Sequence, residues 1–541
     1  MSVEKLYKTY SDHGFLFNDE LVTRYAVSLY SKPFVILSGI SGTGKSKLAQ
    51  LFDPPIHRLE NQPAQQTSSD SNNDDYIILR IRQNMLDGDG RGNFKFSDLA
   101  TIFEEDEIIQ VNEKIEEYKA RGVDDNITDT ELIEIVAPDG QSLKASVYLQ
   151  RASSPLLRVR FRSKRGSQHN FDSRDELAKR YKEGDILKLE KIAPKKLRIT
   201  SINSEEVVAT EANLHQSEIQ SIENKLFVSV RNDWTDSSEI FGFYNVIEDK
   251  YHIPQTLKFL LKALEYPEIP FFLILDEMNL SKVEHYFSDF LSCLESRINK
   301  NGTIIQENIH LHSKGSFTNS DDMYFDLVPS KIQLPLNLYV TGTVNIDEST
   351  YMFSPKVLDR ANVIEFNEVN LQDYKADSTT SDSIFKLSKA PRFGNIEIAS
   401  REHFKNSNED IKSHLIEINK ILEEYNMHFG YRTVNEICLF IKNCIELIND
   451  STNENKIIEL ALDYQIYQKI LPKLHGSFNQ LDEPLRKLIA YLLSDSISFD
   501  NLDSKALHEI DLKTERFPNA VKKLRNMHWN LKTNGFASYL E

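Results

Sequence analysis

The eight residues Gly39-Ile-Ser-Gly-Thr-Gly-Lys-Ser46 constrain the fold more than any other segment. They follow an apolar run at 33–38, which predicts a buried strand, and they open a helix-forming stretch at 45–52 that ends at Pro54-Pro55. Between a strand and a helix, a glycine-rich turn can surround a phosphate with backbone N–H groups, and the helix N-terminus adds positive potential. We therefore expect an α/β fold with a parallel sheet and a bound nucleotide.

Lys45 and Ser46 have distinct expected roles in this loop. The lysine should reach the β- and γ-phosphates, and the serine hydroxyl should hold Mg²⁺. The loop residues expected to contact the nucleotide are Gly39, Ser41, Gly42, Thr43, Gly44, Lys45 and Ser46. The pattern predicts Mg²⁺ as the cofactor and a nucleoside triphosphate, GTP or ATP, as the substrate.

The run Phe271–Leu275 predicts a second buried strand, and two acids follow it directly. Asp276 is expected to organise Mg²⁺, and Glu277 is expected to polarise the attacking water. Two acids after an apolar run are common, so this motif indicates a metal site only in combination with the phosphate loop. Parallel sheets collect ligands at the carboxyl ends of their strands, which would bring both motifs to one edge.

A third predicted strand leads into Asn345, which is placed to position the attacking water. Asp347 or Glu348 would orient the groups that position the attacking water. Arg360 is expected to act on the nucleotide of a neighbouring subunit, because an arginine supplied in trans stabilises charge on the transferring phosphoryl group. The alternative for Arg360 is a surface ion pair with Asp359.

This combination resembles the AAA+ ATPase superfamily. Further segments resemble its McrB branch, the motor subunits of modification-dependent (type IV) restriction systems. These segments are Asp276–Glu295, Gly342–Asn345, Met352–Arg360, Asp233–Asp236 and Phe241–Asn245. The resemblance covers about 31–60 and 225–480. It implies a nucleotide-hydrolysing ring, a hexamer by analogy, that drives a separate McrC-like nuclease in antiphage defence.

The chain departs from the McrB pattern at one position. McrB has Asn-Thr-Ala-Asp after its third strand, whereas Glu348 stands here in place of that aspartate and Asp347 precedes it. McrB prefers GTP, but no residue pattern here distinguishes guanine from adenine. The resemblance also implies a helical lid from which Arg432 would reach the nucleotide, with a surface arginine as the alternative. The segment Lys469–Gly476 resembles a recurring lid segment, and we expect it to serve packing.

The spacing of the motifs predicts an inserted domain. Between Ser46 and Asp276 lie about 230 positions, and a long structureless loop is improbable inside a compact domain. Short strands after residue 142 predict a small β-rich barrel or sandwich. The expected parts are the first part of the core at 1–60, the insert at 61–225, the rest of the core at 226–400 and the lid at 401–541.

Charge is distributed unevenly along the chain. The net charge of −18 alone argues against nucleic-acid binding, yet residues 141–200 carry 16 Lys/Arg against 6 Asp/Glu. Alternate residues of a strand share a face, so basic residues there could lie along phosphates, while aromatic rings could stack on a flipped or unpaired base. The residues expected to bind DNA are Arg158, Arg160, Arg162, Lys164, Arg165, Lys179, Arg180, Tyr148 and Tyr181. The alternative is a basic face that pairs with the acidic stretch 103–140 or makes an oligomer contact.

Several other classes of protein find no support in the sequence. Three cysteines without a CxxC pair argue against a disulfide framework and a structural zinc site. Apolar runs are far shorter than the ~20 residues of a membrane span, and the N-terminal residues lack the features of a secretory signal, so we expect a cytoplasmic protein. We find no nuclease signature. Two alternative functions stay open: a MoxR-like protein-remodelling ATPase whose insert grips a protein, and a nucleotide-gated switch in an antiphage complex.

Overall fold

The computed structural model forms two compact units, one made by the described residues before 63 and after 222 and the other by those between. It describes residues 3–54, 76–81, 83–86, 91–94, 99–120, 131–150, 156–161, 173–203, 222–245, 247, 250–312, 328–346, 351–366, 383–394, 396–450, 452–493 and 516–540. Within these ranges, no helix combines the length and the apolar character that crossing a bilayer requires.

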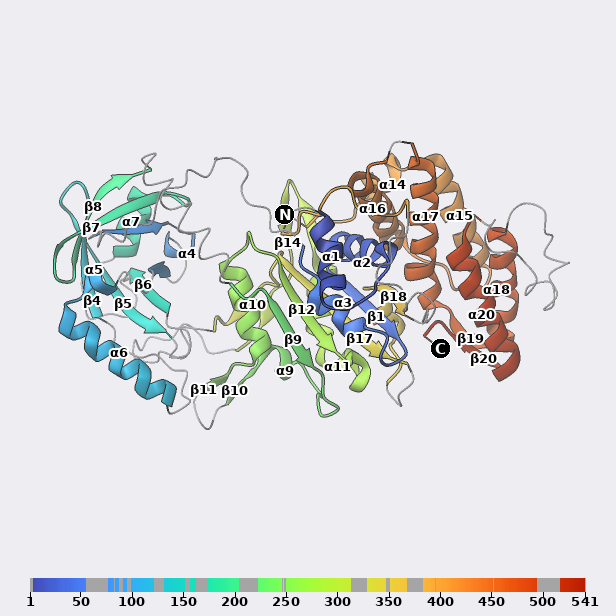
Figure 1. Ribbon diagram of the computed structural model, residues 1–541, viewed down its shortest axis with the longest axis horizontal. Helices are drawn as coiled ribbons and strands as arrows, with labels where there is room; N and C mark the ends of the chain where they lie inside the picture. Colours follow the sequence, from blue (N-terminus) through green and yellow to red (C-terminus); the bar gives the residue numbers. More distant parts are fainter. Residues whose placement is uncertain are drawn as a thin grey trace. The chain divides into compact units, whose positions relative to one another are not determined.

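A five-stranded parallel sheet is the centre of the larger unit (Figure 1). Its strand order is β18-β1-β17-β12-β9, with bounds Asn362–Phe366, Phe34–Gly39, Leu338–Asn345, Phe271–Asp276 and Lys225–Ser229. β1 and β17 are buried at every position, as expected for strands covered on both faces. Gly39 pairs with Asn345, and Leu275 pairs with Gly342. The carboxyl ends of β1, β17 and β12 therefore meet at one edge.

Short helices and hairpins surround this sheet. The helical segments are α1 (Val3–Asp12), α2 (Asp19–Ser31), α3 (Lys45–Leu51), α9 (Ser238–Phe241), α10 (Gln255–Glu265), η2 (Met278–Leu280), α11 (Val283–Tyr286), α12 (Ser288–Ser296) and α13 (Pro355–Leu358). The paired short strands are β10 (Phe243–Asn245) with β11 (Lys250–His252), β13 (Ile298–Lys300) with β14 (Thr303–Ile305), and β15 (Ile309–His310) with β16 (Lys331–Ile332). α2 is buried from Val22 to Leu29, because it contacts both β1 and the C-terminal helices.

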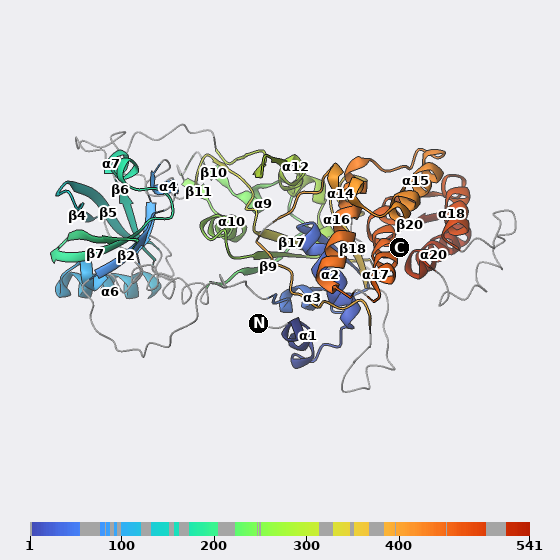
Figure 2. The ribbon, with the colours of Figure 1, turned by 90° about the horizontal axis from the view of Figure 1, so that it is seen from above.

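The C-terminal part of the larger unit is almost entirely helical. Its elements are α14 (Arg401–Asn406), α15 (Glu409–Glu423), α16 (Tyr431–Ile448), α17 (Glu454–Gln465), η4 (Ile466–Ile470), η5 (Leu471–Lys473), β19 (His475–Ser477), α18 (Phe478–Leu492), α20 (Pro518–Asn534) and β20 (Phe536–Ser538). α16 and α17 lie nearer the sheet, and α15, α18 and α20 lie farther from it (Figures 1 and 2). We call this helical part the lid.

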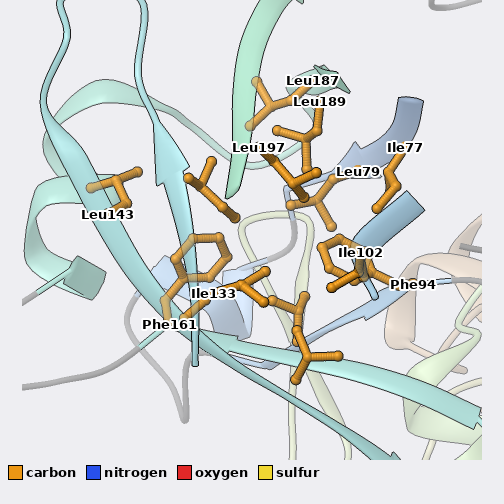
Figure 3. Close-up of a cluster of buried hydrophobic side chains, with 14 of the residues drawn as sticks. Ile77, Leu79, Phe94, Ile102, Ile133, Leu143, Phe161, Leu187, Leu189 and Leu197 are labelled. Atoms are coloured by element: carbon orange, nitrogen blue, oxygen red, sulfur yellow. The ribbon is translucent and has the colours of Figure 1, made fainter. Parts of the chain in front are cut away.

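The smaller unit is built on a seven-stranded sheet of order β2-β7-β8-β4-β5-β6-β3. The strands are β2 (Tyr76–Arg80), β3 (Arg91–Phe94), β4 (Glu131–Val136), β5 (Ser142–Gln150), β6 (Leu156–Phe161), β7 (Ile186–Ala193) and β8 (Lys196–Ile202), and the helices are α4 (Gln83–Leu86), α5 (Leu99–Ile102), α6 (Glu105–Ala120) and α7 (Ser173–Arg180). The edge strands β2 and β3 approach one another, so the sheet curves toward a barrel. Side chains such as Ile77, Ile133 and Leu197 point into one apolar interior (Figure 3). We call this unit the insert.

Candidate nucleotide site

The phosphate loop joins the carboxyl end of β1 to the amino end of α3. Gly42 and Gly44 have φ of 80° and 93°, a left-handed conformation that glycine adopts at little cost. A Cβ atom on Gly39 would lie 2.5 Å from the carbonyl oxygen of Phe366, so a larger residue there would push β18 away. Lys45 is buried, and its ammonium donates hydrogen bonds to the carbonyls of Gly39 (2.9 Å) and Ile40 (2.6 Å). The lysine therefore lies along the inside of the loop.

Ser46 and Asp276 come together although they are far apart in sequence. The Ser46 hydroxyl donates to Oδ1 of Asp276 at 2.6 Å. Thr343 of β17 donates to the same oxygen at 2.7 Å. The contact forms because β17 lies between β1 and β12, so all three groups stand at one edge. A hydroxyl and a carboxylate at this spacing can hold one hard cation.

Glu277 and Asn345 form the second pair of the site. The Asn345 amide donates to Oε1 of Glu277 at 3.1 Å, and Asn279 donates to the Asn345 carbonyl at 3.2 Å. Glu277 has φ 52° and ψ 48°, which non-glycine residues seldom adopt. Its N–H donates to Thr343 Oγ1 at 3.0 Å, which helps to hold this conformation. The predicted residue Asp347 lies outside the described residues.

Thr343 is the site residue that the sequence reasoning missed. It is buried in β17, and its hydroxyl joins the two acids by accepting from the Glu277 N–H and donating to Asp276. One signal was available: a threonine two positions before Asn345 must share a strand face with it. A threonine in a buried strand has many possible partners, so the pattern alone did not select it.

The donor set fits Mg²⁺ bound together with nucleotide phosphates. Mg²⁺ favours oxygen ligands and is often held by one or two carboxylates plus substrate phosphates rather than by a complete protein cage. Asp276 and Ser46 supply such oxygens. Within the described part of the chain, no group of three or more His, Cys, Asp or Glu side chains could hold a metal by itself.

Arg360 lies at the opposite edge of the sheet from its own phosphate loop. Asn362, the first residue of β18, pairs with Val35, whereas the loop follows Gly39 at the other end of β1. Four strand steps separate these positions, about 13 Å. The guanidinium of Arg360 donates to the Lys356 carbonyl at 2.7 Å and contacts Glu295, so its ionic partner is Glu295 and not Asp359. A nucleotide reached by Arg360 would have to belong to another subunit.

Arg432 lies beside Arg360, which differs from the expected contact with its own nucleotide. It lies in the first turn of α16, after Tyr431, and its guanidinium contacts both Glu295 and Asp359. Both arginines therefore share the Glu295 carboxylate. The expectation that Arg432 reaches the nucleotide of its own chain is wrong in this geometry, because the lid packs against the edge of the sheet where β18 begins.

The residues expected to bind DNA are only partly brought together in the insert. Arg158 and Arg160 share the face of β6 opposite the core, and Arg160 lies across from Arg91 of β3. Tyr181 is only 7% exposed within the apolar core, so the expectation that its ring stacks on a base is wrong. Arg162, Lys164, Arg165 and the side chain of Tyr148 lie outside the described residues.

Other basic residues of the insert form ion pairs inside it. These pairs are Arg180–Asp139, Lys179–Glu176, Lys195–Glu107 and Lys196–Glu134. Three of the four acids belong to the acidic stretch 103–140. Residues 101–140 carry 13 Asp/Glu against 3 Lys/Arg, which offsets the basic excess of 141–200. These four basic side chains therefore pair with acids of the insert itself, as the alternative of an internally paired basic face expects.

Comparisons with known proteins match parts of the chain. A family model described as a domain of unknown function (DUF8727) matches residues 381–536, which include the lid helices. No curated protein matches. Among solved structures, the chain is similar to a candidate ATPase from Cytophaga hutchinsonii, with 13% identity, 47% of this chain and 73% of that chain covered, and a TM-score of 0.25.

Proposed function

We propose that this chain is a McrB-like AAA+ NTPase, the motor subunit of a modification-dependent restriction complex in antiphage defence. It hydrolyses GTP or ATP in a homo-oligomeric ring, hexameric by analogy, and drives an McrC-like nuclease, while the insert binds DNA. One observation carries the hydrolytic part of the proposal. The pairs Ser46–Asp276 and Glu277–Asn345 stand at one sheet edge beside the phosphate loop.

Each group of the site has a distinct role in hydrolysis. Lys45 and the loop N–H groups would neutralise and orient the phosphates, and Ser46 and Asp276 would hold Mg²⁺, which would offset charge that develops on the phosphate oxygens. Glu277 accepts a hydrogen bond from the attacking water and draws its proton. Asn345 keeps that carboxylate in place. Arg360 completes the site of the next subunit, so hydrolysis requires assembly.

The substitution Glu277→Gln tests the hydrolytic assignment. It keeps the size of the side chain and removes its basicity, so nucleotide binding and ring assembly should persist while turnover falls by about 100-fold or more. Glu417→Gln, on an exposed position of α15, is the matched control and should hydrolyse like the wild type. Turnover near the wild-type rate in Glu277→Gln would refute the assignment.

A second candidate is a MoxR-like ATPase whose insert grips a protein. The observation that favours it is the pairing of basic with acidic residues inside the insert. Mobility shifts of methylated, unmodified and single-stranded DNA by the full-length chain separate the two candidates. Binding that weakens steeply with salt supports the restriction motor, since released counterions drive such binding. No shift at low salt supports the protein-remodelling function.

A further inference from the structure

The backbone on both sides of Arg360 is held by one lysine of the lid. The Lys469 ammonium donates to the carbonyl of Asp359 at 2.7 Å and to the carbonyl of Ala361 at 3.0 Å. Its side chain is fully buried. Lys32 also donates to the Asp359 carbonyl, but over a longer distance of 3.4 Å. Because Lys469 alone of these two lysines bonds to the carbonyls both before and after Arg360, the path of the chain through residue 360 depends on where Lys469 lies.

Lys469 belongs to the segment 469–476, which the hydrolytic mechanism leaves without a role. It lies in η4, a π-helical turn that follows α17, and such turns occur often at functional sites. The same segment reaches Asp359 a second time, because the Lys473 ammonium lies 2.5 Å from Oδ1 of its carboxylate. The lid therefore contacts both the backbone and the side chain of the residue that precedes Arg360.

Packing alone does not account for a lysine at position 469. Burial lowers its pKa well below the ordinary value, and the attraction of Glu436, 2.7 Å away, opposes this shift. Lys32 of the core donates to the other oxygen of Glu436 at 2.5 Å, so two lysines share one carboxylate. Burial alone would raise the pKa of Glu436, but the two lysines bring it to about 2. Apolar side chains of similar volume often stabilise such interiors better.

We propose that Lys469 is a positioning residue for Arg360, through which the lid sets how that arginine meets the nucleotide of the neighbouring subunit. The inference rests on the proposed ring NTPase. A lid movement that withdraws Lys469 would free the Ala361 carbonyl, leave the Asp359 carbonyl only its 3.4 Å bond from Lys32, and displace the arginine. The conformation of one subunit's lid would then control hydrolysis at its neighbour's site.

Two matched substitutions test the positioning role in the full-length protein. Lys469→Met keeps the buried stem and leaves Lys32 paired with Glu436, but it removes the ammonium that donates to both carbonyls beside Arg360. Lys32→Met removes the other lysine, whose bond to the Asp359 carbonyl is long at 3.4 Å, and keeps both hydrogen bonds from Lys469. We expect Lys469→Met to lower kcat by about 100-fold, the cost of a misplacement near 1 Å, with nucleotide Kd and ring assembly unchanged. Lys32→Met should stay within a few-fold of the wild type.

Mixed rings separate positioning from a general loss of structure. Glu277→Gln subunits cannot hydrolyse but carry an intact Lys469 and Arg360, so an equimolar mixture with Lys469→Met should recover hydrolysis at the sites of Lys469→Met. A mixture of Lys469→Met with Arg360→Ala should show no recovery, because neither subunit supplies a placed arginine. Unfolding temperatures of both methionine variants set the assay temperature, so that each is measured folded.

Three outcomes would be decisive. Wild-type kcat in Lys469→Met would overturn the positioning role. The role also fails if Glu277→Gln restores hydrolysis to Arg360→Ala but not to Lys469→Met. If Glu277→Gln restores neither variant although wild-type rings hydrolyse nucleotide, the trans arrangement of the proposed function fails instead.

Discussion

Thr343 offers the sharpest test of how the site is organised. Thr343→Val keeps the size of the side chain but removes the hydroxyl that donates to Asp276 at 2.7 Å and accepts from the Glu277 N–H at 3.0 Å. A hydrogen bond to a charged group contributes about 1.5–3 kcal/mol. Loss of an outer-shell partner of a metal ligand typically weakens metal binding by about 10- to 100-fold. We therefore expect the Mg²⁺ concentration for half-maximal hydrolysis to rise by about 10- to 100-fold.

The assay is a Mg²⁺ titration of hydrolysis at saturating nucleotide, with Thr341→Val as the control. Thr341 is on the same strand and the same face, is equally buried, and bonds to the Tyr25 hydroxyl at 2.8 Å, away from the acids. Both variants should lose similar stability in denaturant titrations, but only Thr343→Val should shift the Mg²⁺ dependence. Equal Mg²⁺ dependence in the two variants would refute the reasoning that Thr343 orients the metal-binding carboxylate.

Three further predictions concern the supports of the site and the lid. Gly39→Ala would bring a Cβ within 2.5 Å of the Phe366 carbonyl, so it should destabilise the fold by about 1–3 kcal/mol in denaturant titrations and weaken nucleotide binding in calorimetry. Burial raises the pKa of Asp463 to about 6, above the unfolded value near 3.9. The contribution of Asp463 to stability is therefore full below about pH 4 and is lost as pH rises through 6. Asp463→Asn should flatten this part of the pH profile of thermal unfolding. An unchanged profile would contradict the raised pKa of Asp463. Lys523→Met leaves Glu365 buried without its ammonium at 2.8 Å and should cost about 3–5 kcal/mol, whereas Lys523→Met combined with Glu365→Gln should cost less in the same denaturant assay.

Local patterns were sufficient to predict the elements that carry the nucleotide motifs. A strand was predicted at 33–38 and β1 spans Phe34–Gly39, while the third predicted strand, which leads into Asn345, is β17 (Leu338–Asn345). Runs of apolar residues bounded by turns produce this agreement, because a strand buried on both faces needs no alternation. The paired short strands β10–β11 and β13–β14 were not predicted, since three-residue strands carry too little pattern to be distinguished from loops.

The basic stretch of the insert shows where a local pattern misleads. Alternation correctly separates Arg158 and Arg160 from the core face of β6. It does not show that Arg180 contacts Asp139, 41 positions earlier, or that the Tyr181 ring is buried in the apolar core. Charge counted over a short segment omits the acids that folding brings beside it.

The sequence by itself indicated the candidate nucleotide site, because a phosphate loop depends on a contiguous turn between a strand and a helix. The tertiary structure decided which distant groups complete that site. Thr343 joins Asp276 to Glu277 only because β17 lies beside β12, and Arg432 joins Arg360 only because the lid packs against the amino edge of the sheet. Such contacts arise from packing across 65 or more positions, and no local pattern encodes them.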